Sequence, residues 1–242
     1  MAERPLQLFT HPASSLCRRV TYALSFKGVA YETLETDLLH PSPDFLAASH
    51  TNKIPAARVW KQGQAYSLVE SLCLVEYVDS QYHGPPLYPR SLDGTIDWLK
   101  KALLDAAIKK EVEGLLAILS GEIVHSDPEK TLQALKRSLQ GLNDQFLMDG
   151  RNFGHSLLDS DMVSAGDIAL LPLIELVDAC RETLFQGVVL ESYANVWKWY
   201  QRLREQPWVR RNFPGSVHIC NAVKYMLSGK YAKLTLPVTL YD

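Results

Sequence analysis

Short apolar runs alternate with segments of helical periodicity along the first third of the chain. Apolar runs predict four strands, at residues 6–9, 31–34, 57–60 and 65–68. Apolar residues at helical spacing predict three helices, at residues 14–26, 43–49 and 70–81. Because Lys61-Gln62-Gly63-Gln64 is a turn sequence between the last two strands, we expect a hairpin there. The predicted order, β-α-β-α-β-β-α, is that of a small α/β domain.

A stretch rich in proline and glycine, residues 83–93, interrupts this pattern and predicts a stiff connector. Strand signals nearly vanish after it. Helical patterns follow at residues 96–119, 127–148, 168–177, 192–205 and 217–227. Ser164 to Asp167 fits a capping box at the start of the third of these helices. We therefore predict an α/β domain over 1–82, a connector over 83–93 and an all-helical domain over 94–242.

The composition narrows the class of protein. Of the 242 residues, 47% are hydrophobic and 21% are charged, which is the balance of an ordinary globular protein. The formal net charge of −2 offers no basic field for a phosphate backbone, so we expect no nucleic-acid partner. No apolar run approaches the roughly 18 residues that a membrane helix needs, so we expect no membrane partner.

The cysteines and histidines indicate a reducing compartment and no metal. The four cysteines are far apart and form no C-x-x-C pair, which is typical of reduced thiols. The first residues are polar and do not resemble a secretory signal, so we expect a cytoplasmic location. No two of the seven histidines lie four residues apart, and none joins a cysteine at zinc-ligand spacing.

The first candidate for chemistry is Ser14, at the turn from the first strand into the first helix. A thiolate beside its hydroxyl would be stabilised by a hydrogen bond and by the positive end of the helix dipole. A thiol with a pKa of about 8.5 in water would then be largely ionised near neutral pH. The plain alternative is that Ser14 or Ser15 only caps the helix.

The second candidate is Lys53-Ile54-Pro55-Ala56, just before the third strand. An X-Pro bond at a strand entry is a place where a cis peptide occurs. It would turn the backbone of Ile54 outward, so that an extended peptide could pair with it like an added strand. The alternative is a trans proline that only begins an edge strand.

The third candidate is Glu70-Ser71, at the start of the helix over 70–81. A carboxylate can hold an ammonium group, while a hydroxyl at a helix N-terminus can hold a carboxylate. A zwitterionic amino-acid head group needs both side by side. The alternative is a helix cap with a glutamate that only favours the helix dipole. The three functional interpretations predict one another, and the three segments occur in order within one β-α-β-α-β-β-α unit.

These segments resemble cytosolic glutathione transferases of the tau and omega branches and, more distantly, the zeta branch. The resemblance rests on four stretches, Asn52-Lys53-Ile54-Pro55, residues 69–79, Pro86-Leu87-Tyr88-Pro89 and residues 164–170. It implies a thioredoxin-like N-terminal domain, an all-helical C-terminal domain, glutathione as co-substrate, a small hydrophobic electrophile or peroxide as second substrate, and a homodimer. It also implies that some of Trp98, Leu99 and Ala102 border the second-substrate pocket.

The resemblance also implies a role for each candidate residue. Ser14 would donate to the glutathione sulfur, and Ile54, ahead of a cis Pro55, would bond the cysteinyl backbone. Lys53 would neutralise the glycyl carboxylate, while Glu70 and Ser71 would hold the γ-glutamyl head group. Tau members usually offer a second lysine after the second strand. Here the nearest residue is His40, so the second carboxylate contact is open.

Several alternatives remain from the sequence. Omega members carry a catalytic cysteine where this chain has Ser14, and Cys17 follows three residues later. A thiol transferase or dehydroascorbate reductase therefore lacks its nucleophile, unless Cys17 serves, and a buried structural thiol is the alternative for Cys17. The Ser14-Ser15 pair suggests a maleylacetoacetate isomerase. A non-catalytic binding or assembly module of the same fold is the rival outside enzymes.

Overall fold

The computed structural model describes residues 4–124, 127–158 and 160–225. The chain divides into two compact units, Met1–Leu87 with Pro207–Pro214, and Tyr88–Gln206 with Gly215–Asp242. The domain boundaries expected from the sequence remain a proposal. The compact units differ from them at 207–214, a segment that follows most of the helical region in sequence but belongs to the N-terminal unit.

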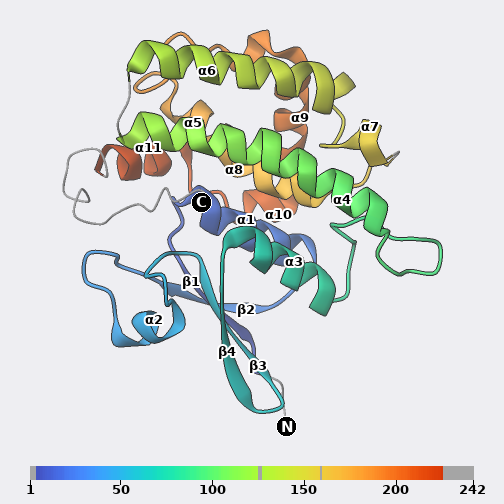
Figure 1. The fold of residues 1–242 in the computed structure, drawn as a ribbon. Helices are drawn as coiled ribbons and strands as arrows, with labels where there is room; N and C mark the ends of the chain where they lie inside the picture. Colours follow the sequence, from blue (N-terminus) through green and yellow to red (C-terminus); the bar gives the residue numbers. More distant parts are fainter. Residues whose placement is uncertain (1–3, 125–126, 159, 226–242) are drawn as a thin grey trace. The chain divides into compact units, whose positions relative to one another are not determined.

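A four-stranded sheet of order β2-β1-β3-β4 forms the centre of the N-terminal unit (Figure 1). The strands are β1 (Leu6–Thr10), β2 (Tyr31–Glu35), β3 (Ala56–Lys61) and β4 (Gln64–Val69). β1 pairs with β2 in parallel and with β3 antiparallel, and β3 pairs antiparallel with β4. The two-residue turn between β3 and β4 has positive φ at both Gln62 and Gly63, which matches the twist of a hairpin.

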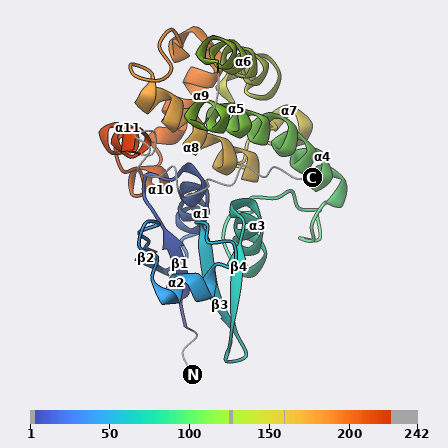
Figure 2. The same cartoon turned by 60° about the vertical axis from the view of Figure 1, so that its left-hand side comes forward.

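Helices cover both faces of this sheet. α1 (Ser15–Phe26) and α3 (Ser71–Gln81) lie side by side on one face (Figures 1 and 2). α2 (Pro43–Ala48) packs on the other, where Phe45 meets Phe9 of β1 at 5.8 Å between ring centroids. Successive side chains of a strand point to opposite faces of the sheet, so the neighbouring apolar side chains of β1 are buried under the helices of both faces. The thioredoxin-like α/β fold expected for this part of the chain is confirmed.

The segment 207–214 completes the N-terminal unit. It contains α10 (Pro207–Arg210), whose Trp208 ring makes edge contacts with Tyr22 and Phe26 of α1, at centroid distances of 5.7 and 5.5 Å. Farther along, Asn212 accepts a hydrogen bond from the Tyr31 hydroxyl at 3.3 Å. A four-residue helix carries too little periodicity to be seen in the sequence, so its place is set by these tertiary contacts.

A buried ion pair joins the ends of α1 and α3. Lys27 Nζ lies 2.9 Å from Asp79 Oδ1, and both side chains are 2% exposed. The same carboxylate accepts from the Leu87 backbone N–H at 2.8 Å, and Lys27 also donates to the Pro85 carbonyl at 3.3 Å. The pair therefore fixes the first part of the connector against the two helices.

Every element named in the described part of the second unit is a helix. Its elements are α4 (Trp98–Ala107), η1 (Ile108–Val112), α5 (Glu113–Val124), α6 (Pro128–Gly141), η2 (Leu142–Phe146), η3 (Met148–Gly150), α7 (His155–Leu158), α8 (Ala165–Cys180), η4 (Leu190–Ser192), α9 (Ala194–Arg204) and α11 (Ser216–Tyr225). The single helix predicted over 96–119 is instead α4 and α5 joined by the π-helical turn η1, which keeps the rod continuous (Figures 1 and 2). Residues 226–227 of the predicted last helix lie outside the described residues. No described helix is long and apolar enough to cross a bilayer.

The predicted capping box opens α8 and anchors the helical unit. The Ser164 hydroxyl accepts from the backbone N–H groups of Gly166 and Asp167, and the Asp167 carboxylate accepts from the Ser164 N–H at 2.8 Å. Asp167 is fully buried and also accepts from the Phe153 N–H and the Trp199 indole N–H, each at 2.7 Å. Burial raises the pKa of this carboxyl, and its hydrogen bonds oppose that rise. Asp167 is thus a structural residue.

Gly166 is required by the packing of this corner. A Cβ at Gly166 would collide with the ring of Phe153, which is itself stacked on Phe146 at 5.3 Å. We expect Gly166→Ala to destabilise the protein by about 1–3 kcal/mol, because the added methyl group would force the Phe153 ring out of its packed position. Urea unfolding followed by circular dichroism measures this loss.

Gly114, in α5, provides the matched control. A Cβ there would meet no atom within 4 Å. Gly114→Ala should therefore raise stability by about 0.5–1 kcal/mol through the better helix propensity of alanine. Equal effects of the two substitutions would contradict the packing argument.

Candidate functional site

The strand register gathers the predicted site residues at one end of the sheet. Phe9, near the carboxyl end of β1, pairs with Ala56 at the start of β3, and Ala56 pairs with Val69 at the end of β4. The carboxyl end of β2 lies at the same edge, since Thr10 is opposite Glu35. The loop to Ser14, the segment Lys53-Ile54-Pro55, Glu70 with Ser71, and the loop that carries His40 all extend from this edge.

Ser14 is the N-cap residue of α1. Its Oγ accepts a hydrogen bond from the Cys17 backbone N–H at 3.3 Å, and its own N–H donates to the His11 carbonyl at 3.0 Å. The side chain is half-buried. Ser14 is therefore a helix cap, as the plain alternative predicted, and the same position keeps its hydroxyl beside the first-turn N–H groups of α1.

Cys17 lies one turn inside α1 and is 1% exposed. Burial raises the pKa of its thiol, while hydrogen bonds from the Ser14 and Thr10 side chains partly oppose the rise. A thiol in this setting stays protonated near neutral pH and is inert. The geometry agrees with a structural Cys17.

The second segment is bent by a cis peptide bond between Ile54 and Pro55. Ser49 supports it from α2's C-terminal end, because the Ser49 hydroxyl donates to the Lys53 carbonyl at 2.9 Å and accepts from the Lys53 N–H at 3.0 Å. Ile54 packs in part against the apolar cluster around Phe9. The backbone of Lys53 is thus held at both of its polar atoms, and its side chain is half-buried.

Glu70 has an unusual backbone. Its φ of 68° and ψ of 118° lie outside the regions that a non-glycine residue normally occupies. Such a conformation costs on the order of 1–3 kcal/mol and concentrates at ligand sites. The side chain is exposed and makes no capping hydrogen bond to α3. The alternative in which Glu70 acts as a helix cap therefore lacks its bond.

Ser71 is buried at the first turn of α3, where its hydroxyl accepts from Arg19 Nη1 at 3.2 Å. Arg19 and Arg18, both on α1, are 1% exposed. Arg18 donates to the carbonyls of Ala13, at 3.2 Å, and Pro12, at 3.4 Å, so it braces the loop before Ser14. Arg18 and Arg19 are thus buried, and each donates hydrogen bonds to neighbouring groups of the fold.

His40 lies on the loop after β2 and is largely exposed. Its Nδ1 is 3.0 Å from Asp37 Oδ2. This hydrogen bond is the main reason why the pKa of the Asp37 carboxyl is lowered. His40 therefore lies at the same edge of the sheet as the other candidates and already has an acidic neighbour. Its role toward a ligand remains a prediction.

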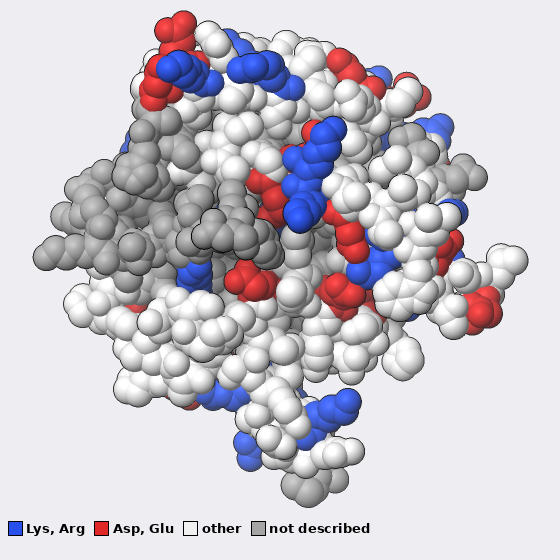
Figure 3. Space-filling view, viewed as in Figure 1, with Lys and Arg blue, Asp and Glu red and all other residues white. Residues whose placement is uncertain are grey.

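Neither a metal-binding group nor a surface field of one charge sign was found at this site among the described residues. Among the described residues, no group of three or more histidine, cysteine, aspartate or glutamate side chains is arranged to hold a metal ion. On the face shown in Figure 3, acidic and basic side chains are interspersed without a field of one sign. The polar groups at the sheet edge suit a small zwitterionic ligand better than a polyanion.

The region that holds the candidate residues is similar to known proteins. The family model described as the N-terminal domain of glutathione S-transferases matches residues 8–86, which include nearly the whole sheet and every candidate residue. A probable glutathione S-transferase of Solanum tuberosum is 28% identical over 195 residues, covering 77% of this chain and 80% of that protein. Glutathione S-transferase U1 of Arabidopsis thaliana is 24% identical, covering 88% and 90%. Residues 8–86 thus match the N-terminal domain of glutathione S-transferases, and proteins named glutathione S-transferases are similar to most of the chain.

Solved structures of glutathione transferases share the fold over both units. A rice glutathione transferase in complex with glutathione superposes with a TM-score of 0.78 and 22% identity, covering 93% of this chain and 99% of that one. The Omega 3C transferase of Trametes versicolor gives a TM-score of 0.75 and 19% identity, covering 96% and 94%. The predicted fold class and the resemblance to glutathione transferases are confirmed. A maleylacetoacetate isomerase of Pseudomonas aeruginosa is 31% identical over 87 residues, which is 34% of this chain and 40% of that protein.

Proposed function

We propose that the protein binds glutathione at the edge of the sheet in the N-terminal unit and activates its thiol for attack on a small hydrophobic electrophile or a peroxide. Ser14 donates to the glutathione sulfur, and Ile54 pairs with the cysteinyl backbone ahead of Pro55. Lys53 neutralises the glycyl carboxylate, with His40 as a second contact. Glu70 and Ser71 hold the γ-glutamyl head group.

One observation carries the proposal: the register brings the N-cap serine of α1, the start of β3 and the strained Glu70 to a common edge. The chain tolerates the backbone cost at Glu70 and leaves the carboxylate exposed. An exposed carboxylate with no capping bond is suited to an ammonium group from a ligand. The adjacent N-terminus of α3 and the Ser71 hydroxyl suit the carboxylate of the same head group.

The chemistry follows from the protons around Ser14. Its oxygen already accepts from the Cys17 N–H, and a hydroxyl keeps one proton to donate. Cys17, as a buried neutral thiol, is a weak acceptor beside it. A bound thiolate is a stronger one, and donation to it supports ionisation of glutathione without a covalent enzyme intermediate. The buried Cys17 gives no support to a thiol-transferase mechanism.

The second substrate is proposed as a small hydrophobic electrophile or a peroxide, as the resemblance to glutathione transferases implies, and α4 of the helical unit exposes large apolar side chains. Trp98 is 69% exposed and Leu99 is 72% exposed. Exposed apolar groups of this size favour contact with an apolar ligand or partner. A cytoplasmic location and a homodimer are part of the proposal, the first from the four free cysteines and the second from the family.

Binding of reduced glutathione, measured by isothermal titration calorimetry, tests the proposal. Wild-type protein should give a saturable heat. Glu70→Gln keeps the size of the side chain and removes its charge, so it should raise the Kd about 10- to 100-fold through loss of a hydrogen bond between charged groups.

Glu76→Gln, six residues farther along α3, is the matched control and should leave the Kd near the wild-type value. Absence of any saturable heat with the wild-type protein would instead identify a non-catalytic module. An equal loss for both glutamates would move the head group away from Glu70.

A further inference from the structure

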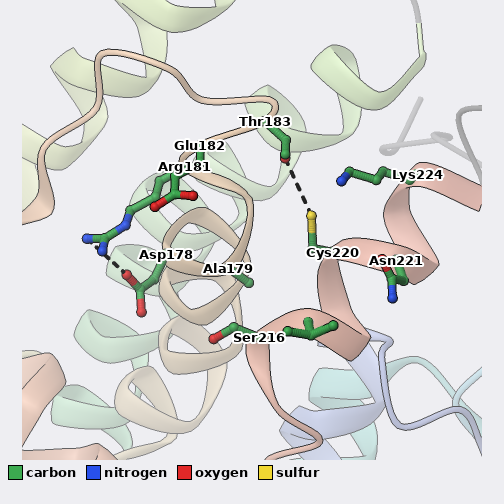
Figure 4. Close-up of a pocket in the computed structure, with 10 residues that line it drawn as sticks. Asp178, Ala179, Arg181, Glu182, Thr183, Ser216, Cys220, Asn221 and Lys224 are labelled. Carbon is green, nitrogen blue, oxygen red and sulfur yellow. Dashed lines mark hydrogen bonds and ion pairs between the residues drawn. The ribbon is translucent and has the colours of Figure 1, made fainter.

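Two thiols meet in the helical unit, outside the glutathione site. Cys180 is the last residue of α8, and Cys220 lies in α11, which packs against α8. The hydroxyl of Thr183, just past the end of α8, donates to the Cys180 carbonyl at 3.1 Å, and the two cysteines are 0% and 8% exposed. The Cys220 sulfur is also 3.5 Å from the Thr183 hydroxyl (Figure 4).

The two sulfurs differ in access. Cys220 lines a cavity of about 380 Å³, together with Thr183, Asn221 and Lys224, whereas Cys180 does not line it. Figure 4 shows Cys220 and Lys224 on α11 at this cavity. A small solute such as a peroxide can therefore reach Cys220 from the cavity, whereas it cannot reach Cys180 directly.

Charge at the cavity supports the same order. Burial, followed by the neighbouring Cys220, raises the pKa of the Cys180 thiol to about 12, so Cys180 remains protonated. Lys224, one helical turn after Cys220, lowers the pKa of Cys180 but does not outweigh these causes. Cys220 is thus the sulfur placed to react with an oxidant, and Cys180 the one placed to resolve it.

We propose that Cys180 and Cys220 form a reversible disulfide when the protein meets hydrogen peroxide. The Cys220 thiolate attacks one peroxide oxygen; an S–O bond forms, the O–O bond breaks, and the departing hydroxide takes a proton to become water. The Cys180 thiol then transfers its proton to the sulfenic acid oxygen as its sulfur attacks the Cys220 sulfur; an S–S bond forms, the S–O bond breaks, and the oxygen leaves as water. Two thiols lose two electrons, and one peroxide becomes two waters.

This cross-link would tie the end of α8 to α11 by a covalent bond. It is independent of the glutathione chemistry at Ser14, because all its groups belong to the helical unit. The other two cysteines serve as internal references. Cys17 is buried in the N-terminal unit, and Cys73 is exposed on α3.

The test uses the full-length protein, reduced and then treated with a small excess of hydrogen peroxide. After catalase, free thiols are alkylated in denaturant, and a non-reducing digest is mapped by mass spectrometry. We expect the Cys180 and Cys220 peptides joined with a loss of about 2 Da, and separated again by dithiothreitol. Finding both cysteines alkylated while Cys73 is oxidised would overturn the proposal, as would links from either one to Cys17 or Cys73.

Variants assign the roles of the two sulfurs. Cys220→Ser should abolish the cross-link and leave Cys180 alkylated. Cys180→Ser should leave Cys220 as a sulfenic acid that dimedone traps. Cys73→Ser, the control, should form the cross-link at the wild-type rate. Dimedone labelling of Cys180 in place of Cys220 would reverse the proposed order and contradict it. The wild-type map alone decides the link if a variant does not fold.

Discussion

Replacing Ser14 by alanine should lower kcat/KM for conjugation of glutathione to an aryl halide by about 10²- to 10³-fold at neutral pH, the cost of removing one donor to a developing or stabilised anion. The loss should shrink as the pH rises. Without the hydroxyl, the thiol of bound glutathione returns toward its pKa of about 8.5 in water and ionises unaided in alkaline solution. Steady-state rates at saturating glutathione, measured from acidic to alkaline pH, give both results.

Ser15→Ala is the matched control for this experiment. Ser15 is the first residue of α1 and lies next to Ser14, but its hydroxyl accepts from Arg18 at 3.5 Å and is not the N-cap. It should retain most of the wild-type rate and the same pH profile. Ser14→Cys should gain disulfide-reducing activity at the expense of conjugation. A Ser14→Ala protein with the wild-type rate and profile would refute the proposed role of the hydroxyl.

The largest loss of stability is expected at Asp167. Asp167→Ala should lower the free energy of unfolding by about 3–5 kcal/mol, because several buried donors lose their acceptor together. These donors are the N–H groups of Phe153 and Ser164, the Ser164 hydroxyl and the Trp199 indole. Urea unfolding, followed through tryptophan fluorescence and circular dichroism, measures the loss.

Asp144→Ala is the control for Asp167→Ala. Asp144 accepts hydrogen bonds from Gln140 at the surface, where water replaces them at little cost. Its unfolding curve should overlay that of the wild type. If Asp167→Ala also overlaid the wild type, the capping box would contribute nothing to the stability of the helical unit.

The sequence predicted the N-terminal strands and helices well because the spacing of apolar residues within each of them is a local signal. Every strand and helix predicted over residues 6–81 is present, and no end is shifted by more than one residue. The capping box of α8 was also predictable, since its two bonded residues are three apart in sequence. All candidate residues at the sheet edge follow from motifs within this region.

Other features depend on contacts between distant residues. The burial of Arg18 and Arg19 runs against their residue type and is explained only by the carbonyls and the hydroxyl that they meet. The positive φ of Glu70 has no signal in composition or periodicity. The π-helical turn η1 also escaped prediction, because one extra residue per turn hardly disturbs an apolar pattern.

The location of Trp208 has a consequence for how the protein is made. A ribosome finishes residues 1–87 long before it reaches 207–214, so the nascent sheet and its helices exist for that interval with Tyr22 and Phe26 lacking their indole partner. An expression fragment that stops after the connector would keep these apolar rings exposed and should be prone to aggregate. Fusing residues 207–214 to such a fragment through a flexible linker would restore the Trp208 ring to its place against Tyr22 and Phe26.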